Sequence, residues 1–580
     1  MTRALSKERS ARYDSSEEFL RALDEARPAD PAGGALAGLS ANVAERLTPA
    51  LRLAALGLGV AGLAAYLLLH RQVDPWSATA ARLGRGEALA SARAFLVQQG
   101  ATGFYDEAAL FHGNDSLQAF LHYALGPRAG ARWSDSIAPV RHWHVWWTRA
   151  GRSEQWQLQV GTSGAVLVFS HQADTTTRVA PPPSPGDREA AEKFLSARGW
   201  DVARLQWLGD SALAARGAAR SYLWAVASDS VLAPSITTPE RRRLRVDVRE
   251  ARVLGFRDEV VLPAAFRGGR FGIDPALNRA QDFGIAILLT LPLIVAIVRL
   301  ARGSGQQLRW KGATAVVAVA CVASALSFVL DWPRYAAGSS RGEALSALSL
   351  NLLPILILAP LGVLVAAIAD DMARSTFPGS TAGVVELAQG RWRSGSVALA
   401  WMTSYAVAAL FLWSGVVADW WTARPGAMRE MSAVDVSAFN AWIPLSPFAV
   451  GLAGSSAAVF VGLAIGGTLF LFARRRLWLA ATLGAALISV LGVQGLYAWT
   501  PNLVYAALFA GLFVACLTRL GLLALWLGLI TANCVSSAAE LLGSASAGYL
   551  GRGVLVLSFA AIPAVIGLLS DRRRIVRERA

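Results

Sequence analysis

The side chains that could bind a metal ion or transfer a proton are unevenly spread along the 580 residues. All six histidines lie at or before position 171. His142 and His144 stand two positions apart in an aromatic run, and residues i and i+2 of a strand face the same way. No cysteine and no obvious carboxylate accompanies them at ligand spacing. We therefore interpret the pair as part of an aromatic strand, with metal ligation by His142 and His144 as the weaker alternative, and predict no cofactor.

The composition predicts that most of the elements that position these residues are helices within a membrane. The chain is 54% hydrophobic and 16% charged, whereas a soluble domain has roughly a quarter of charged residues. The net charge of +15 mostly borders apolar runs, so we expect the lipid bilayer as partner and no nucleic acid. Ten apolar runs have about the length that crosses a bilayer: 51–69, 283–300, 312–330, 344–369, 396–418, 446–472, 477–498, 502–518, 520–543 and 553–570.

The first run begins too far along the chain for a cleaved signal peptide. We expect a signal anchor over 50–70 and a nine-span bundle over 283–570. Basic residues follow alternate runs, and such residues are typical of cytoplasmic loops. They are Arg299, Arg302, Arg309, Lys311, Arg374, Arg391, Arg393, Arg474, Arg475, Arg476, Arg519 and the arginines of the basic tail 571–580. This alternation predicts a bacterial cytoplasmic membrane protein with both termini in the cytoplasm.

Residues 73–281 would then form one extracytoplasmic domain, which contains no cysteine. It contains an internal repeat, with one copy over about 86–172 and the other over about 187–262. In each copy a short amphipathic helix ends at a glycine, Gly100 or Gly199, that can take a positive φ. A proline-rich linker, 181–186, separates the copies.

Alternating patterns after each helix predict antiparallel strands. They cover 140–147, 156–160, 165–169, 222–226, 244–248 and 253–256. The fold class is therefore a polytopic α-helical membrane protein of about ten spans with one α+β domain between spans one and two. This pattern of helix, glycine and hairpin resembles a tandem of PepSY-like units, which implies a protein or peptide ligand outside the membrane.

Two turns in the second half of the bundle carry a further resemblance. A basic turn with a tryptophan runs from Arg474 to Leu479, and an Arg-x-Gly-Leu-Leu turn from Arg519 to Leu523. With the segment from Phe439 to Pro444, they resemble the CAAX-protease and bacteriocin-processing (CPBP) intramembrane endopeptidases over about 439–545. By architecture, the resemblance extends over about 80–570. It implies catalysis by a Glu-Glu-x-x-x-Arg motif, a later histidine and a final His-x-x-x-Asn/Asp, in which the glutamate activates water.

These catalytic residue types are missing here. The glutamate pair should fall near Ala458, Val459 and Phe460, and the arginine near Ala464. The histidines should fall near Val493 and Leu529, and only Asn533 matches the last motif. Glu386, Asp370 and Asp371 belong to a predicted cytoplasmic loop, and we interpret Glu540, near the end of its apolar run, as an interfacial residue. The sequence thus predicts a pseudoprotease with no catalytic residues.

The first 25 residues form a separate pattern within the tail 1–49. Ala4-Leu5-Ser6-Lys7 and Arg12-Tyr13 precede a capping box at Ser15 and Glu18. They resemble the end of a bacterial serine/threonine kinase C-lobe, which is followed by a linker and a membrane span. No phosphate-transfer motif precedes them. The resemblance implies either a start codon placed too late or a truncated derivative of a receptor-like kinase.

Four functions therefore stay open. We favour a non-catalytic, CPBP-like membrane protein with an outer sensing or binding domain. The alternatives are the membrane and sensor portion of a transmembrane serine/threonine kinase, an active intramembrane peptidase with a rearranged site, and a transporter. A transporter is disfavoured because few charged residues lie within the apolar runs. Ligand, substrate and oligomeric state have no signature in the sequence.

Overall fold

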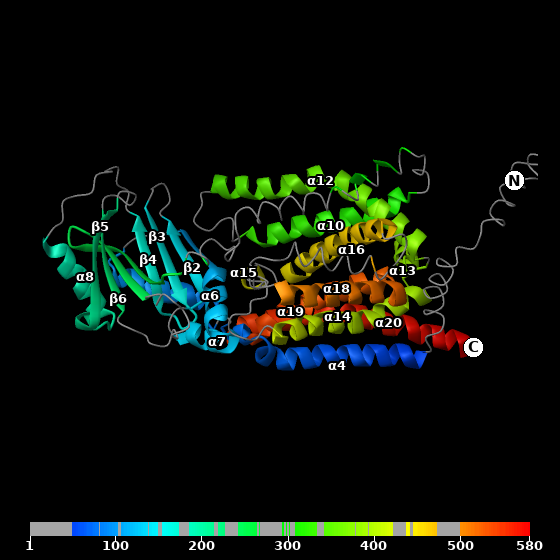
Figure 1. Ribbon diagram of the computed structural model, residues 1–580, viewed down its shortest axis with the longest axis horizontal. Coiled ribbons are helices and arrows are strands. Elements are labelled where there is room, and N and C mark those ends of the chain that lie inside the picture. The colour runs from blue at the N-terminus through cyan, green and yellow to red at the C-terminus, as the bar shows by residue number, and fades with distance from the viewer. Residues whose placement is uncertain are drawn as a thin grey trace, which may run out of the picture.

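The chain folds into a sheet domain and a helical bundle that meet end to end (Figure 1). The computed structural model describes the following residues: 49–79, 82–101, 106–136, 139–148, 154–172, 185–213, 219–226, 242–263, 266, 290, 293–294, 297–298, 301, 308–332, 341–377, 379–392, 394–421, 437–440, 445–472, 479 and 499–579. The kinase-like segment 1–25 lies outside them.

The sheet domain is built on one eight-stranded antiparallel sheet in the order β1-β2-β3-β4-β8-β7-β6-β5. The strands are β1 (Asp106–Gly113), β2 (Arg141–Thr148), β3 (Gln155–Gly161), β4 (Val166–Gln172), β5 (Leu205–Leu213), β6 (Ala219–Val226), β7 (Arg242–Arg249) and β8 (Arg252–Val260). Two four-stranded meanders join at the centre, where Phe169 of β4 is opposite Phe256 of β8. The repeat in the sequence therefore corresponds to two halves of a single sheet.

A helix precedes each half of the sheet. Helix α5 (Arg85–Gln98) and helix α8 (Pro185–Ala197) are followed by Gly100 (φ 75°) and Gly199 (φ 85°), as predicted. The apolar side of α5 packs on the sheet, where the rings of Phe95 and Phe169 lie 5.1 Å apart. The 3-10 turn η3 (Val202–Arg204) leads from α8 into β5.

The six predicted strands correspond to β2, β3, β4, β6, β7 and β8, but the first strand of each half was not predicted. Strand β1 lacks alternation because three consecutive residues, Ala109 to Phe111, are buried. Strand β5 contains a bulge where Gly209 takes a φ of 127° and the register shifts. Helices α6 (Asp115–Leu125) and α7 (Pro127–Ser136), inserted between β1 and β2, were also not predicted.

The bundle contains seven helices that are long and apolar enough to cross a membrane, among the described residues. They belong to α4 (Pro49–Val73), α10 (Trp310–Leu330), α12 (Arg341–Thr376), α14 (Gly395–Trp421), α16 (Ser446–Phe472), α19 (Leu522–Gly543) and α20 (Ala547–Arg579). An eighth predicted run corresponds to the shorter apolar stretch Ala506–Leu520 of α18 (Trp499–Leu520). The runs 283–300 and 477–498 lie outside the described residues except for single positions, so ten spans remain a prediction.

Helices α14 and α19 form the interior of the bundle, and small residues let them approach closely. A Cβ on Gly528 of α19 would lie 2.5 Å from Cγ1 of Val407 on α14. On the other side of α14, a Cβ on Gly59 of α4 would lie 2.4 Å from the backbone nitrogen of Ala406. Packing through small residues is typical of helices in membranes.

The two ends of the bundle differ. The sheet domain occupies one end, together with the short helix α15 (Ser437–Asn440) and the 3-10 turn η2 (Pro75–Thr79). Helix α13 (Ala382–Ala388) and the C-terminal part of α20 lie at the opposite end (Figure 1). There the backbone N–H of Leu522 donates to Ser380 (2.8 Å) and joins the turn after α12 to the turn after α18. Arg374 in the last turn of α12, Arg391 after α13 and Arg519 in the last turn of α18 therefore share the end away from the sheet.

Candidate functional site

The sheet domain and the bundle share one cluster of buried apolar side chains. Phe439 of α15 contacts Phe111 of β1 and Tyr549 of α20, each with ring centroids 5.0 Å apart. Trp143 of β2 stacks on Tyr549 at 6.4 Å and an interplanar angle of 16°. The cluster continues from there into α19, where Ala538 is buried. The sheet domain is thus packed on the bundle. We call the contacts of Phe111, Trp143, Phe439 and Tyr549 the seat.

Asn440 makes this seat specific. Its side-chain Oδ1 accepts from the backbone N–H of Phe111 (2.6 Å), and its Nδ2 donates to the carbonyl of Phe111 (2.8 Å). Strand β1 is an edge of the sheet, and an edge leaves backbone groups unpaired. The amide of Asn440 therefore pairs with β1 as a neighbouring strand would. Arg85 of α5 donates to the backbone carbonyl of Asn440 (2.6 Å).

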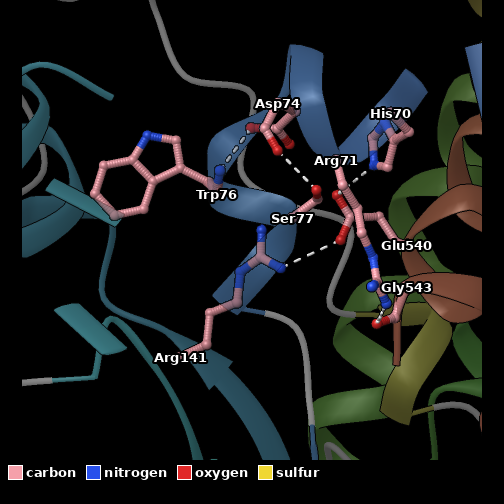
Figure 2. Close-up of polar contacts among 8 residues, drawn as sticks. All are labelled: His70, Arg71, Asp74, Trp76, Ser77, Arg141, Glu540 and Gly543. Atoms are coloured by element: carbon pink, nitrogen blue, oxygen red, sulfur yellow. Dashed lines mark hydrogen bonds and ion pairs between the residues drawn. The ribbon is translucent and has the colours of Figure 1, made fainter. Parts of the chain in front are cut away.

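A cluster of charged side chains lies beside this seat (Figure 2). His70 is in the last turn of α4, Asp74 follows one turn later, Glu540 is in the last turns of α19, and Arg141 begins β2. His70, Arg141 and Glu540 are buried, and Asp74 is half-buried. We call these four residues the junction cluster.

Glu540 is the centre of the junction cluster. One carboxylate oxygen, Oε2, accepts from Nη1 of Arg141 (3.2 Å). The other, Oε1, lies 3.6 Å from Nε2 of His70. The carboxyl group thus links the sheet domain to the first helix of the bundle. Glu540 lies near the end of α19, as expected, and its side chain is buried there. Its place at a membrane interface stays a prediction.

Local contacts hold the backbone of Asp74 and one oxygen of its carboxyl group. The backbone N–H of Asp74 donates to His70 O (2.7 Å), which continues the helical pattern of α4 by one residue. The backbone N–H of Trp76 donates to Oδ1 of Asp74 (3.0 Å), and the Ser77 hydroxyl donates to its backbone carbonyl (2.6 Å). Arg71 donates to the carbonyl of Gly543 and ties the end of α4 to the end of α19. Figure 2 shows these contacts around the cluster.

The junction cluster contains a carboxyl group with a raised pKa and buried nitrogen atoms without hydrogen bonds in the described part of the chain. Removal from water, and to a smaller extent the nearby carboxylate of Glu540, raises the pKa of Asp74 to about 6. Nε2 of His70 and both Nε and Nη2 of Arg141 are buried without a hydrogen-bond partner in the described part of the chain. Buried polar atoms are nearly always paired, so these three atoms lack the partners that burial normally requires.

The donor atoms of three of these residues are close enough to share an ion. Atoms of His70, Asp74 and Glu540 lie within 4.8 Å of one another, the only such group of three among the described residues. A sequence signal for this site does exist. His70 and Asp74 are four positions apart at a helix end, and that spacing puts both on one helix face. No signal connects them to Glu540 or Arg141.

His142 and His144, the histidines singled out in the sequence, lie elsewhere. Both belong to β2, as expected, and the ring of His144 stacks on Trp146 with centroids 3.9 Å apart. The ring of His142 lies 5.6 Å from that of His112 on β1. Burial, and after it the charge of neighbouring histidines, lowers the pKa of His142 to about 3 and that of His144 to about 4.

Of the positions at which the CPBP resemblance would require catalytic residues, Val459 and Ala464 on α16 and Leu529 on α19 are buried in one apolar cluster. Asn533 donates from Nδ2 to the Ser455 hydroxyl (3.2 Å) and to the carbonyl of Leu529 (3.0 Å). Val493 lies outside the described residues. Asn533 therefore has a helix-to-helix contact rather than an ionisable neighbour.

No protein-family model, curated protein or solved structure matches this chain in comparisons of sequence and fold.

Proposed function

We propose that the chain is a non-catalytic multi-pass protein of the bacterial cytoplasmic membrane, a degenerate CPBP-like bundle with an extracytoplasmic sensing domain. The observation that carries this proposal is the shared apolar cluster in which Phe111 and Trp143 of the sheet meet Phe439 and Tyr549 of the bundle. A domain attached only by flexible linkers would move independently. Here, a change in the position of the sheet caused by a bound ligand would displace the helix ends that pack against it.

The absence of peptidase chemistry is supported by what fills the motif positions. A general base must be ionisable and close to the scissile bond. Val459, Ala464 and Leu529 belong to an apolar cluster instead, and none of these three side chains is ionisable. Asn533 alone supplies a hydrogen-bond donor without a base beside it.

The sensing role is supported by where the seat lies. Asn440, Phe439 and Tyr549 stand at the ends of α15 and α20, and Glu540 stands at the end of α19. A protein or peptide bound to the sheet domain would shift β1 or β2 against these ends. Because α19 runs through the interior of the bundle, such a shift would pass to the opposite membrane face.

The first test compares two asparagine variants of the full chain in lipid nanodiscs by amide hydrogen exchange. Asn440→Ala removes both hydrogen bonds to Phe111. We expect faster exchange in β1, α15 and the adjoining ends of α19 and α20, since each buried hydrogen bond contributes about 1 kcal/mol. Asn533→Ala is the matched control and should affect only α16 and α19. Faster exchange confined to β1 in Asn440→Ala would show that the sheet is not coupled to the bundle.

The second test addresses catalysis. The purified full chain in liposomes should leave a fluorogenic peptide uncleaved. Hydrolysis that persists through purification and disappears in Asn533→Ala would replace this proposal with an active peptidase.

A kinase connection is a second candidate, favoured by the residues Ala4 to Lys7 and Arg12-Tyr13. If the DNA upstream of Met1 encodes a kinase domain in frame, the same coupling would carry a signal from the sheet domain to that kinase. A stop codon immediately upstream of Met1 would exclude this arrangement. Sequencing that DNA and mapping the transcript start decides between the two.

A further inference from the structure

The junction cluster brings together three side chains that can bind a metal ion, and one of them, His70, has a buried nitrogen without a hydrogen bond in the described part of the chain. Nε2 of His70 is buried and faces Oε1 of Glu540 at 3.6 Å, which is too long for a hydrogen bond. Asp74 supplies the third donor within 4.8 Å. An imidazole nitrogen and two carboxylates that converge in this way form a typical ligand set for a divalent ion.

The distances suit a small ion. In a tetrahedral zinc site with bonds of about 2.0 to 2.2 Å, neighbouring ligand atoms are roughly 3.4 Å apart. The pair His70 and Glu540 is already near that separation. Asp74 lies just beyond the end of α4 and is half-buried, so its side chain can close the remaining gap and leaves a route from solvent.

The charges also favour a cation. Two carboxylates, Asp74 and Glu540, face one guanidinium, Arg141, and a histidine. Burying a carboxylate without a compensating charge is costly. A divalent ion would supply the missing positive charge and satisfy Nε2 of His70 at the same time.

Arg141 fits the role of an outer support. It holds Oε2 of Glu540 (3.2 Å), so that Oε1 faces Nε2 of His70 at 3.6 Å. Carboxylates that bind metals are usually held by such a second hydrogen bond. Since Arg141 begins β2, the same contact would place the sheet domain over the ion.

We propose that His70, Asp74 and Glu540 bind a zinc ion, which joins α4 to α19 beneath the sheet domain. The ligand set selects zinc over calcium or magnesium because those ions prefer oxygen ligands only. The proposal does not depend on the sensing function, since the ion would bind whether or not the sheet recognises a ligand.

The test uses the full chain, purified in detergent without a histidine tag, stripped with EDTA and titrated with zinc sulfate. We expect one zinc per chain by mass spectrometry of the metal content, and a zinc-dependent rise in the melting temperature. Removing an outer-shell partner typically costs 10 to 100-fold in metal affinity. Loss of a direct ligand in His70→Gln or Asp74→Asn should therefore reduce affinity by more than about 100-fold. His171→Gln, on β4, is the matched control and should bind zinc like the wild type.

Asp74→Asn separates binding from folding. Without zinc and at pH 8, this variant should melt at or above the wild-type temperature, because it removes a negative charge that lies close to the carboxylate of Glu540. It should nevertheless show no rise when zinc is added. Two results would overturn the proposal: a wild-type chain that binds no zinc, or zinc bound equally well by His70→Gln and Asp74→Asn.

Discussion

At the scale of single residues, the position of His142 and His144 in β2 lowers the pKa of both side chains. His142 is buried between β1 and β3, and it is opposite His112 and Gly161. Its pKa is lowered to about 3 by burial, and then by the neighbouring His112 and His144. The unfolded chain binds a proton at His142 near pH 6.5, so the folded chain binds fewer protons between pH 6.5 and 3.

This difference predicts the direction of a pH effect. The stability contributed by neutral His142 is fully present above about pH 6.5 and is lost as pH falls toward 3. The slope is about 1.4 kcal/mol per pH unit for one such group. His142→Gln should make the melting temperature of the detergent-solubilised chain less sensitive to pH between 6.5 and 4. His112→Gln, at an exposed position, should keep most of the sensitivity. Equal pH profiles for wild type and His142→Gln would contradict the assignment.

At the scale of elements, the close approach of α4 and α14 depends on single glycines. Gly57 and Gly59 are both in α4, but only Gly59 faces α14. A Cβ at position 59 would meet the Ala406 nitrogen at 2.4 Å, whereas a Cβ at position 57 would have nothing within 4 Å. Close packing at a residue without a side chain, rather than an ion pair, therefore explains the short distance between α4 and α14 at this point.

The two glycines form a matched pair for mutation. Gly59→Ala should push α4 from α14 and lower stability by about 1 to 3 kcal/mol, as is usual for overpacking. Gly57→Ala should be neutral or slightly stabilising, because alanine favours a helix over glycine by up to about 1 kcal/mol. Thermal unfolding in detergent, followed by circular dichroism, measures both. A similar loss in the two variants would show that α4 does not cross α14 at Gly59.

At the scale of the whole molecule, the sheet domain and a group of basic residues occupy opposite ends of the bundle. Basic loops are typical of the cytoplasmic face. Arg374, Arg391 and Arg519 share one end, which is the arrangement expected if the sheet domain is outside the cell. The orientation itself is a prediction that labelling can test.

Two exposed glutamines mark the two ends. Gln98 lies at the end of α5 in the sheet domain, and Gln389 follows α13. A membrane-impermeant maleimide should label Gln98→Cys in spheroplasts and Gln389→Cys only in inverted vesicles. The unchanged chain gives the background, since its three cysteines lie within helices. The reverse pattern would place the sheet domain in the cytoplasm.

The sequence by itself determined the elements whose signals are local. Hydropathy located the seven described helices that are long and apolar enough to cross a membrane, because crossing a bilayer demands an unbroken apolar run. The glycines at 100 and 199 located the helix ends, because only a positive φ permits those turns. Strands β1 and β5 were not predicted, because each lacks the alternation on which such a prediction depends. Strand β1 has three buried residues in a row, and β5 contains a bulge.

Only the tertiary structure decided how the two parts meet. Arg141 and Glu540 are 399 positions apart, and each alone resembles an ordinary polar residue at the end of an element. Asn440 and Phe111 are separated by 329 positions, and their pairing exists because β1 is an edge strand that ends the sheet beside α15. Contacts of this kind have no periodicity or spacing in the sequence. They arise only when folding brings the end of α19 under the sheet, and with it the junction cluster.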